Sequence, residues 1–193
     1  MRIIFFVLVI GFACTTKDKT QSKISDSNDN ALIDAQIHGF LRWYSANWDT
    51  LNVDLLNPII DNSLQSFPDS TKPYKINYDN AEIYLNQFRQ SGYISDSYIN
   101  SFRDYFKQCQ KEFEITPQFD GPPYGFEFDF VFRSQMYDYE KKSPDSARVT
   151  DISIEGDKAK ASVKYFEEYF YYYQLTKTND KWLIDNIKAT YEK

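Results

Sequence analysis

The C-terminal stretch ARVTDISIEGDKAKASVKYFEEYFYYYQLTKTNDKWLIDNIKAT, residues 147–190, decides the fold. Apolar and polar side chains alternate along it with the two-residue period of a β-strand. Interruptions of this pattern divide the stretch into four predicted strands, at about 147–154, 158–166, 169–177 and 181–190. Polar turns at 155–157 and 179–180 join neighbouring strands as hairpins, and Glu167 and Glu168 are predicted to turn the chain between the middle two. The pattern therefore predicts an antiparallel meander.

Three amphipathic helices are predicted ahead of this meander, at about 31–48, 80–91 and 96–111. In each of them apolar residues return every three or four positions, as they do on the buried face of a helix. Asp29 or Asn30 can cap the first helix. Asp79 and Glu82 form an approximate capping box for the second, and Gly92 is placed to end it.

Helices followed by a run of antiparallel strands indicate the α+β class. We expect the N-terminal helices to pack on one face of a curved antiparallel sheet and to leave a cone-like cavity between the two layers. A further strand is predicted at 127–137, after a turn-rich loop at 119–125, because its residues alternate as in a strand.

The predicted strand 127–137 supplies candidate ligand-binding residues. Asp129, Arg133 and Gln135 would share one face of it, and successive side chains on one face lie about 6.5–7 Å apart. Tyr44 and Trp48, one helical turn apart, would wall the same cavity. An ion pair between Asp129 and Arg133 on a solvated face is the favoured alternative for the strand, and core packing explains the two aromatic residues equally well.

The first residues, MRIIFFVLVIGFAC at 1–14, combine a positive start with an apolar run that is too short to span a bilayer. Small residues before Cys14 make the segment resemble the lipobox of bacterial lipoproteins. The resemblance implies that residues 1–13 are a signal peptide and that Cys14 is lipidated. It also implies a protein held in the cell envelope, with the outer membrane favoured. Polar residues 14–30 are predicted to be a disordered tether, and residues 31–193 a single domain.

Composition excludes several classes of function. The net charge of −6 argues against nucleic acid, whose phosphates require a basic surface. His38 is the only histidine, and no metal motif or phosphate-binding glycine loop is present, so no metal and no cofactor is predicted. With Cys14 acylated, Cys109 has no disulfide partner and is expected to be buried on its helix.

Five further stretches carry a resemblance: FLRWYSANWDTLN at 40–52, SGYISDSYINSFRDYF at 91–106, DG at 120–121, GFEFDFVFRSQ at 125–135 and KWLIDNI at 181–187. Together and in this order they resemble the bacterial family called domain of unknown function 3828, within the nuclear transport factor 2-like superfamily. The resemblance implies a cone-like fold. That fold hosts isomerases, dehydratases and non-catalytic binding modules, so it does not decide the activity.

Three functions remain open at this point. The favoured one is a lipid-anchored envelope domain that binds a small molecule or an envelope protein without catalysis. The second is a small cofactor-free enzyme, in which a buried Asp129 acts as general base for proton transfer or dehydration. The third is a homodimeric interaction subunit that associates through its sheet, for which an exposed aromatic face in the run 165–173 would be the sign.

Overall fold

A computed structural model describes residues 18–61, 71–133, 138–165 and 169–191. Its α-helices are α1 (Asp18–Ala46), α2 (Tyr78–Ser91), α3 (Asp96–Ile115) and α4 (Asp138–Lys142). It also has a short π-helix, η1 (Thr50–Leu55), and two 3-10 helices, η2 (Asn57–Ile59) and η3 (Pro144–Ser146). Its strands are the short pair β1 (Ile60–Asp61) and β2 (Lys75–Ile76), followed by β3 (Arg148–Glu155), β4 (Lys158–Lys164), β5 (Tyr169–Thr178) and β6 (Lys181–Tyr191). The predicted signal peptide and Cys14 lie outside the described residues.

The last four strands form one antiparallel sheet in the order β3-β4-β5-β6, which confirms the predicted meander. The β5–β6 hairpin turns at Asn179 and Asp180, whose φ angles are both positive, at 49° and 61°. Two consecutive residues of this kind give the turn whose twist matches that of the flanking strands. The predicted turn at Glu167 and Glu168 lies outside the described residues.

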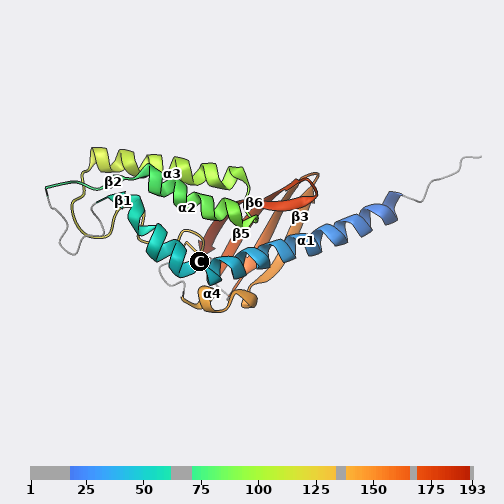
Figure 1. The fold of residues 1–193 in the computed structure, drawn as a ribbon. Helices are drawn as coiled ribbons and strands as arrows, with labels where there is room; N and C mark the ends of the chain where they lie inside the picture. The colour runs from blue at the N-terminus through green and yellow to red at the C-terminus, as the bar shows by residue number, and fades with distance from the viewer. Residues whose placement is uncertain (1–17, 62–70, 134–137, 166–168, 192–193) are drawn as a thin grey trace, which may run out of the picture.

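The helices cover one face of this sheet, which confirms the α+β class (Figure 1). α1 runs diagonally across the strands, and α2 and α3 pack beside it. Alternate residues of the central strands point toward these helices and are buried. The largest fully buried side chains of the whole core include Trp182, Tyr44, Tyr84, Tyr173, Phe40, Phe88, Phe106, Phe130 and Phe132. Aromatic rings therefore fill much of the space between helices and sheet.

Helix α1 begins at Asp18, well before the predicted start near residue 31. The prediction that residues 14–30 form a disordered tether is therefore wrong for residues 18–30. Once a packed segment has nucleated a helix, each added residue gains a hydrogen bond at little cost, so the helix extends past its apolar stripe. Asp29 lies inside the helix and does not cap it, because its carboxylate reaches the sheet instead.

The prediction of a strand at 127–137 is also wrong over its described part, residues 127–133, which form turns and no ladder. Phe130, Val131 and Phe132 are consecutive and all buried, which a strand with two different faces does not allow. The cause is Asp129, whose side chain bonds the backbone two and three residues on and so holds the chain in a turn.

Candidate functional site

Three of the predicted ligand residues, Tyr44, Trp48 and Asp129, do meet in the structure. The carboxylate of Asp129 is only 3% exposed. Its Oδ2 accepts hydrogen bonds from the Tyr44 hydroxyl at 2.9 Å and from Trp48 Nε1 at 2.8 Å. Its Oδ1 accepts from the backbone N–H groups of Val131 at 2.9 Å and Phe132 at 2.7 Å. The side chain thereby fastens the turn at 129–133 to the end of α1.

Burial raises the pKa of Asp129, while the four donors, the Phe132 N–H foremost, act in the opposite direction. Burial, with the charge of Asp129 added, raises the pKa of Tyr44 far above its ordinary value, so this hydroxyl stays protonated as a donor. All four acceptor positions of a carboxylate are occupied by donors of the protein itself. A general base needs one such position for the proton of its substrate. The geometry thus favours a structural role for Asp129.

A small cleft of about 320 Å³ lies beside this cluster and is lined by Trp48, Asn52, Leu56, Asn57, Phe126, Glu127, Phe128 and Asp129. The Trp48 ring is held on its other side, because Lys141 Nζ lies 3.6 Å from the ring centroid and also pairs with Asp49 at 3.0 Å. The Trp48 side chain is therefore held by its hydrogen bond to Asp129 and by its contact with Lys141, so it has little freedom to close on a ligand.

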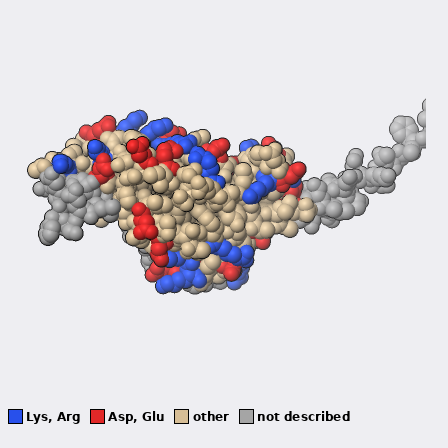
Figure 2. Space-filling model, viewed as in Figure 1, with Lys and Arg blue, Asp and Glu red and all other residues tan. Residues whose placement is uncertain are grey.

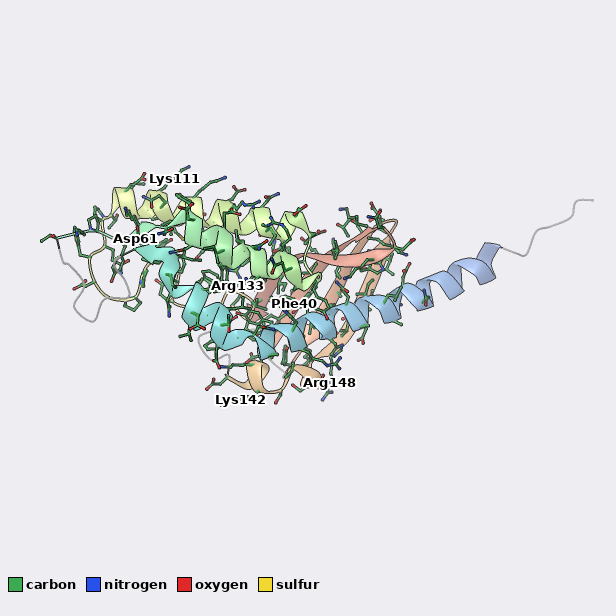
Figure 3. The ribbon with its side chains drawn as sticks, in the orientation of Figure 1. Phe40, Asp61, Lys111, Arg133, Lys142 and Arg148 are labelled. Carbon is green, nitrogen blue, oxygen red and sulfur yellow. The ribbon has the colours of Figure 1, made fainter. Side chains whose placement is uncertain are left out.

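Arg133 does not extend this cluster along a strand. The guanidinium carbon of Arg133 lies 5.8 Å from the ring centroid of Phe102 and 5.7 Å from that of Phe128. Figure 3 places Arg133, like Phe40, between α1 and the pair formed by α2 and α3. Gln135 lies outside the described residues. The predicted placement of Asp129 and Arg133 on one strand face is therefore wrong, since residues 127–133 form no strand.

The surroundings of His38 and Cys109 indicate structural roles for both residues. The two ring nitrogens of His38 lie 3.0 Å from the backbone oxygens of Asp34 and Ala147, which joins α1 to the start of β3. Cys109 is buried on α3, as expected, and burial raises the pKa of its thiol to about 11. A thiol with this pKa is protonated and unreactive at neutral pH.

The face of the sheet turned away from the helices carries a second group of polar residues, which the sequence analysis did not single out. Register places them in three rows across the strands. Their members are Glu155, Lys158 and Thr176 in the first row, Ser153, Lys160, Gln174 and Asn186 in the second, and Asp151, Ser162, Tyr172 and Lys188 in the third. The sequence does show that polar residues alternate with apolar ones along each predicted strand. Which polar residues of different strands lie side by side depends on the strand register, which the sequence pattern does not give.

A hollow of about 520 Å³ lies over this open face of the sheet. Two serines at the start of α3, Ser97 and Ser101, also line it. The polar sheet residues that line it are Ser153, Glu155, Lys158, Lys160, Gln174, Asp185 and Asn186, and Ala159 and Leu175 complete the lining. A second hollow, of about 660 Å³, is also lined by Ser153, Lys160, Gln174 and Tyr172, but its lining includes Asn30 of α1 and the core residues Ile152, Ala161 and Tyr173.

Hydrogen bonds between neighbours hold several of these side chains in place. Lys158 Nζ donates to Thr176 Oγ1 at 2.6 Å, and this hydroxyl donates in turn to the Asp185 carboxylate. Asn186 Nδ2 donates to Gln174 Oε1 at 3.3 Å. A shift in register between β5 and β6 at Gln174 and Leu175 brings Asp185 into this arrangement. The open face is therefore partly pre-organised.

The aromatic run of β5 divides between the two faces of the sheet. Tyr171 and Tyr173 are buried in the core, whereas Tyr172 is 43% exposed on the open face. On the described part of this face Tyr172 is exposed among polar rows and Phe170 is half-buried, which is not the continuous apolar patch that marks a stable protein interface. The sheet face consequently gives less support to the homodimer than a fully aromatic face would.

Charge distribution, metal ligands and membrane-spanning helices are further indicators of function over the described residues. On the face shown in Figure 2, positive and negative side chains are interspersed, and neither sign dominates a large area. Within the described ranges, no three His, Cys, Asp or Glu residues are grouped as metal ligands. No helix in the described part of the chain combines the length and the apolar content needed to cross a bilayer. No protein-family model, curated protein or solved structure matches this chain.

Proposed function

We propose that this chain is a lipid-anchored domain of the cell envelope that binds a ligand without transforming it, and that the ligand site is the open face of the sheet. The observation that carries the proposal is the three-row register of polar side chains beneath a hollow of about 520 Å³. Polar groups that converge on a concave surface can fix the orientation of a bound ligand.

The saturated carboxylate of Asp129 supports binding over catalysis. The residue that the enzyme alternative requires as general base already accepts four hydrogen bonds from the protein. On the open face, by contrast, the ammonium groups of Lys158 and Lys160 and the carboxylate of Glu155 lie on exposed residues at the hollow. These groups are accessible to a ligand that arrives from solvent.

A thermal-shift screen of the full chain in detergent tests the location of the site. The probes are sugars, amino acids, short peptides, nucleosides and carboxylic acids. A ligand that binds only the native state at 100 times its dissociation constant adds about 2.7 kcal/mol of stability. We expect a probe that raises the melting temperature of the wild type to lose its effect with Lys160→Ala or Gln174→Ala and to keep it with Asn57→Ala, which alters the cleft beside Asp129. If the effect of the probe is instead lost with Asn57→Ala and kept with the other two variants, the ligand site is the cleft beside Asp129.

The membrane attachment rests on the N-terminal sequence alone and has its own test. Mass spectrometry of the chain expressed in a bacterial host should show a mature protein that begins at Cys14 and carries acyl chains. The variant Cys14→Ser should remain unprocessed and unlipidated. A mature N-terminus at any other residue would contradict the lipoprotein assignment.

A further inference from the structure

We infer that the open face of the sheet binds a carbohydrate chain. The inference rests on the proposed binding function and names the ligand class. Its first support is the mixture of groups at the hollow: the hydroxyls of Ser97, Ser101 and Ser153, and the amides of Gln174 and Asn186. Hydroxyl and amide groups each offer both donors and acceptors. Vicinal sugar hydroxyls, which also donate and accept, are matched by such a surface.

The charges of the hollow exclude ligands of a single sign. Lys158 and Lys160 lie in it with Glu155 and Asp185, so the two signs balance. A phosphate or an acidic peptide would meet the two carboxylates, and a basic peptide would meet the two ammonium groups. A neutral polyhydroxylated ligand can bond both kinds of group without repulsion, since a hydroxyl donates to a carboxylate and accepts from an ammonium.

Tyr172 supplies the apolar contact that a sugar ring also needs. Its side chain stands in the third row, next to the row of Lys160 and Gln174, and successive residues on one strand face lie about 7 Å apart. The exposed ring is a rigid, amphipathic surface. One face of a pyranose presents C–H groups to such a ring while its hydroxyls reach the neighbouring polar side chains.

The extent of the polar rows indicates an elongated ligand. Register places the row of Lys158, the row of Lys160 and the row of Tyr172 side by side on the open face. Successive residues on one strand face lie about 7 Å apart, so the first and third rows are about 14 Å apart. A single sugar unit would cover part of this distance, whereas an oligosaccharide can contact the polar rows and the tyrosine ring at once.

Isothermal titration calorimetry on the full chain in detergent tests this inference. The probes are the single sugars, tetramers and hexamers of glucose, xylose and N-acetylglucosamine, with inorganic phosphate and a neutral pentapeptide as comparison ligands. We expect at least one oligosaccharide series to bind, and to bind more tightly as its length increases. Tyr172→Ala should weaken that binding about tenfold, as the loss of one aromatic contact of about 1.4 kcal/mol predicts.

Matched variants separate this role from a general effect on folding. Tyr172→Phe keeps the ring and should change the affinity by less than about threefold. Tyr124→Ala removes a tyrosine that is exposed on the loop after α3 and should leave the affinity unchanged. If none of the sugars binds while another class of probe shows the Lys160-dependent thermal shift, the carbohydrate inference is wrong and the proposed function stands. If no probe of any class binds, both are wrong.

Discussion

At the scale of single residues, Asp129 is the side chain on which the local structure most depends. Replacing it by alanine leaves the Tyr44 hydroxyl, the Trp48 indole N–H and two backbone N–H groups without the acceptor they share. Each buried donor that loses its partner costs roughly 1–3 kcal/mol, although relaxation and water recover part of the total. We expect Asp129→Ala to lower the free energy of unfolding by about 3 kcal/mol or more.

Urea denaturation of the full chain, followed by tryptophan fluorescence, measures this loss. Trp48 bonds Asp129 directly and should shift its native emission in the variant. The matched control is Asp104→Ala, because this aspartate is 75% exposed in a surface pair with Lys107 and its removal should change stability by about 0.5 kcal/mol or less. Equal stabilities for the two variants would show that the Asp129 bonds do not hold the turn.

At the scale of elements, the start of α2 distinguishes two candidate caps. The sequence predicts a capping box from Asp79 and Glu82, but in the structure Asn77 is the cap, and its side chain accepts a hydrogen bond from the Asn80 N–H at 3.1 Å. Glu82 instead pairs with Arg103 of α3 through two bonds of 2.6 Å. The capping-box prediction is therefore wrong, since Glu82 is engaged between helices.

The structure consequently predicts that Asn77→Ala lowers the free energy of unfolding by about 1 kcal/mol, within the range of about 0.5–2 kcal/mol for loss of an N-cap. Asp79→Ala, two residues on, should cost less than about 1 kcal/mol, because it removes only a charge near the helix N-terminus. Thermal unfolding followed by circular dichroism gives both values. A larger loss of stability for Asp79→Ala than for Asn77→Ala would support Asp79 as the cap, as the sequence predicts.

Most elements were predictable because their patterns are local. Gly92 ends α2 with a φ of 72°, as its position predicts, and the four strands of the meander follow the two-residue period. The segment 127–133 was not predictable in this way, because FEFDF alternates like a strand while Asp129 bonds its own backbone and the end of α1. Whether a carboxylate is buried and bonded in this way depends on partners that are distant in the sequence. The spacing of apolar residues does not reveal such partners.

The candidate site was predictable only in part for the same reason. The sequence favoured Tyr44, Trp48 and Asp129 as neighbours lining one cavity, because an aromatic pair one helical turn apart and an acidic residue among apolar ones are local signals. It did not predict that the two aromatic residues donate hydrogen bonds directly to the carboxylate. The polar rows of the open face depend on strand register, and β6 shifts its register beside Gln174 in a way that no local pattern marks.

At the scale of the whole molecule, Asp29 joins the first helix to the last hairpin. Its Oδ1 accepts from Lys177 Nζ at 2.8 Å and from Trp182 Nε1 at 3.1 Å, across more than 140 residues of sequence. The hydrogen bond from Lys177 holds the pKa of Asp29 below its ordinary value, although partial burial opposes this. Asp29 therefore belongs to the folded domain, although it lies within the segment 14–30 that the sequence predicts to be a tether.

A carboxyl group whose pKa is lower in the folded state stabilises the fold above its unfolded pKa of about 3.9, and this contribution is lost as the pH falls through the folded pKa. We therefore expect Asp29→Asn to lower the free energy of unfolding by about 1 kcal/mol at pH 7, because the pair with Lys177 is partly solvated. The difference from the wild type should shrink as the pH falls from about 5 to about 3. Urea denaturation across this pH range measures it, with Asp104→Asn as the control for loss of one exposed charge. A difference that stays constant with pH would mean that the charge of Asp29 does not link α1 to the β5–β6 hairpin.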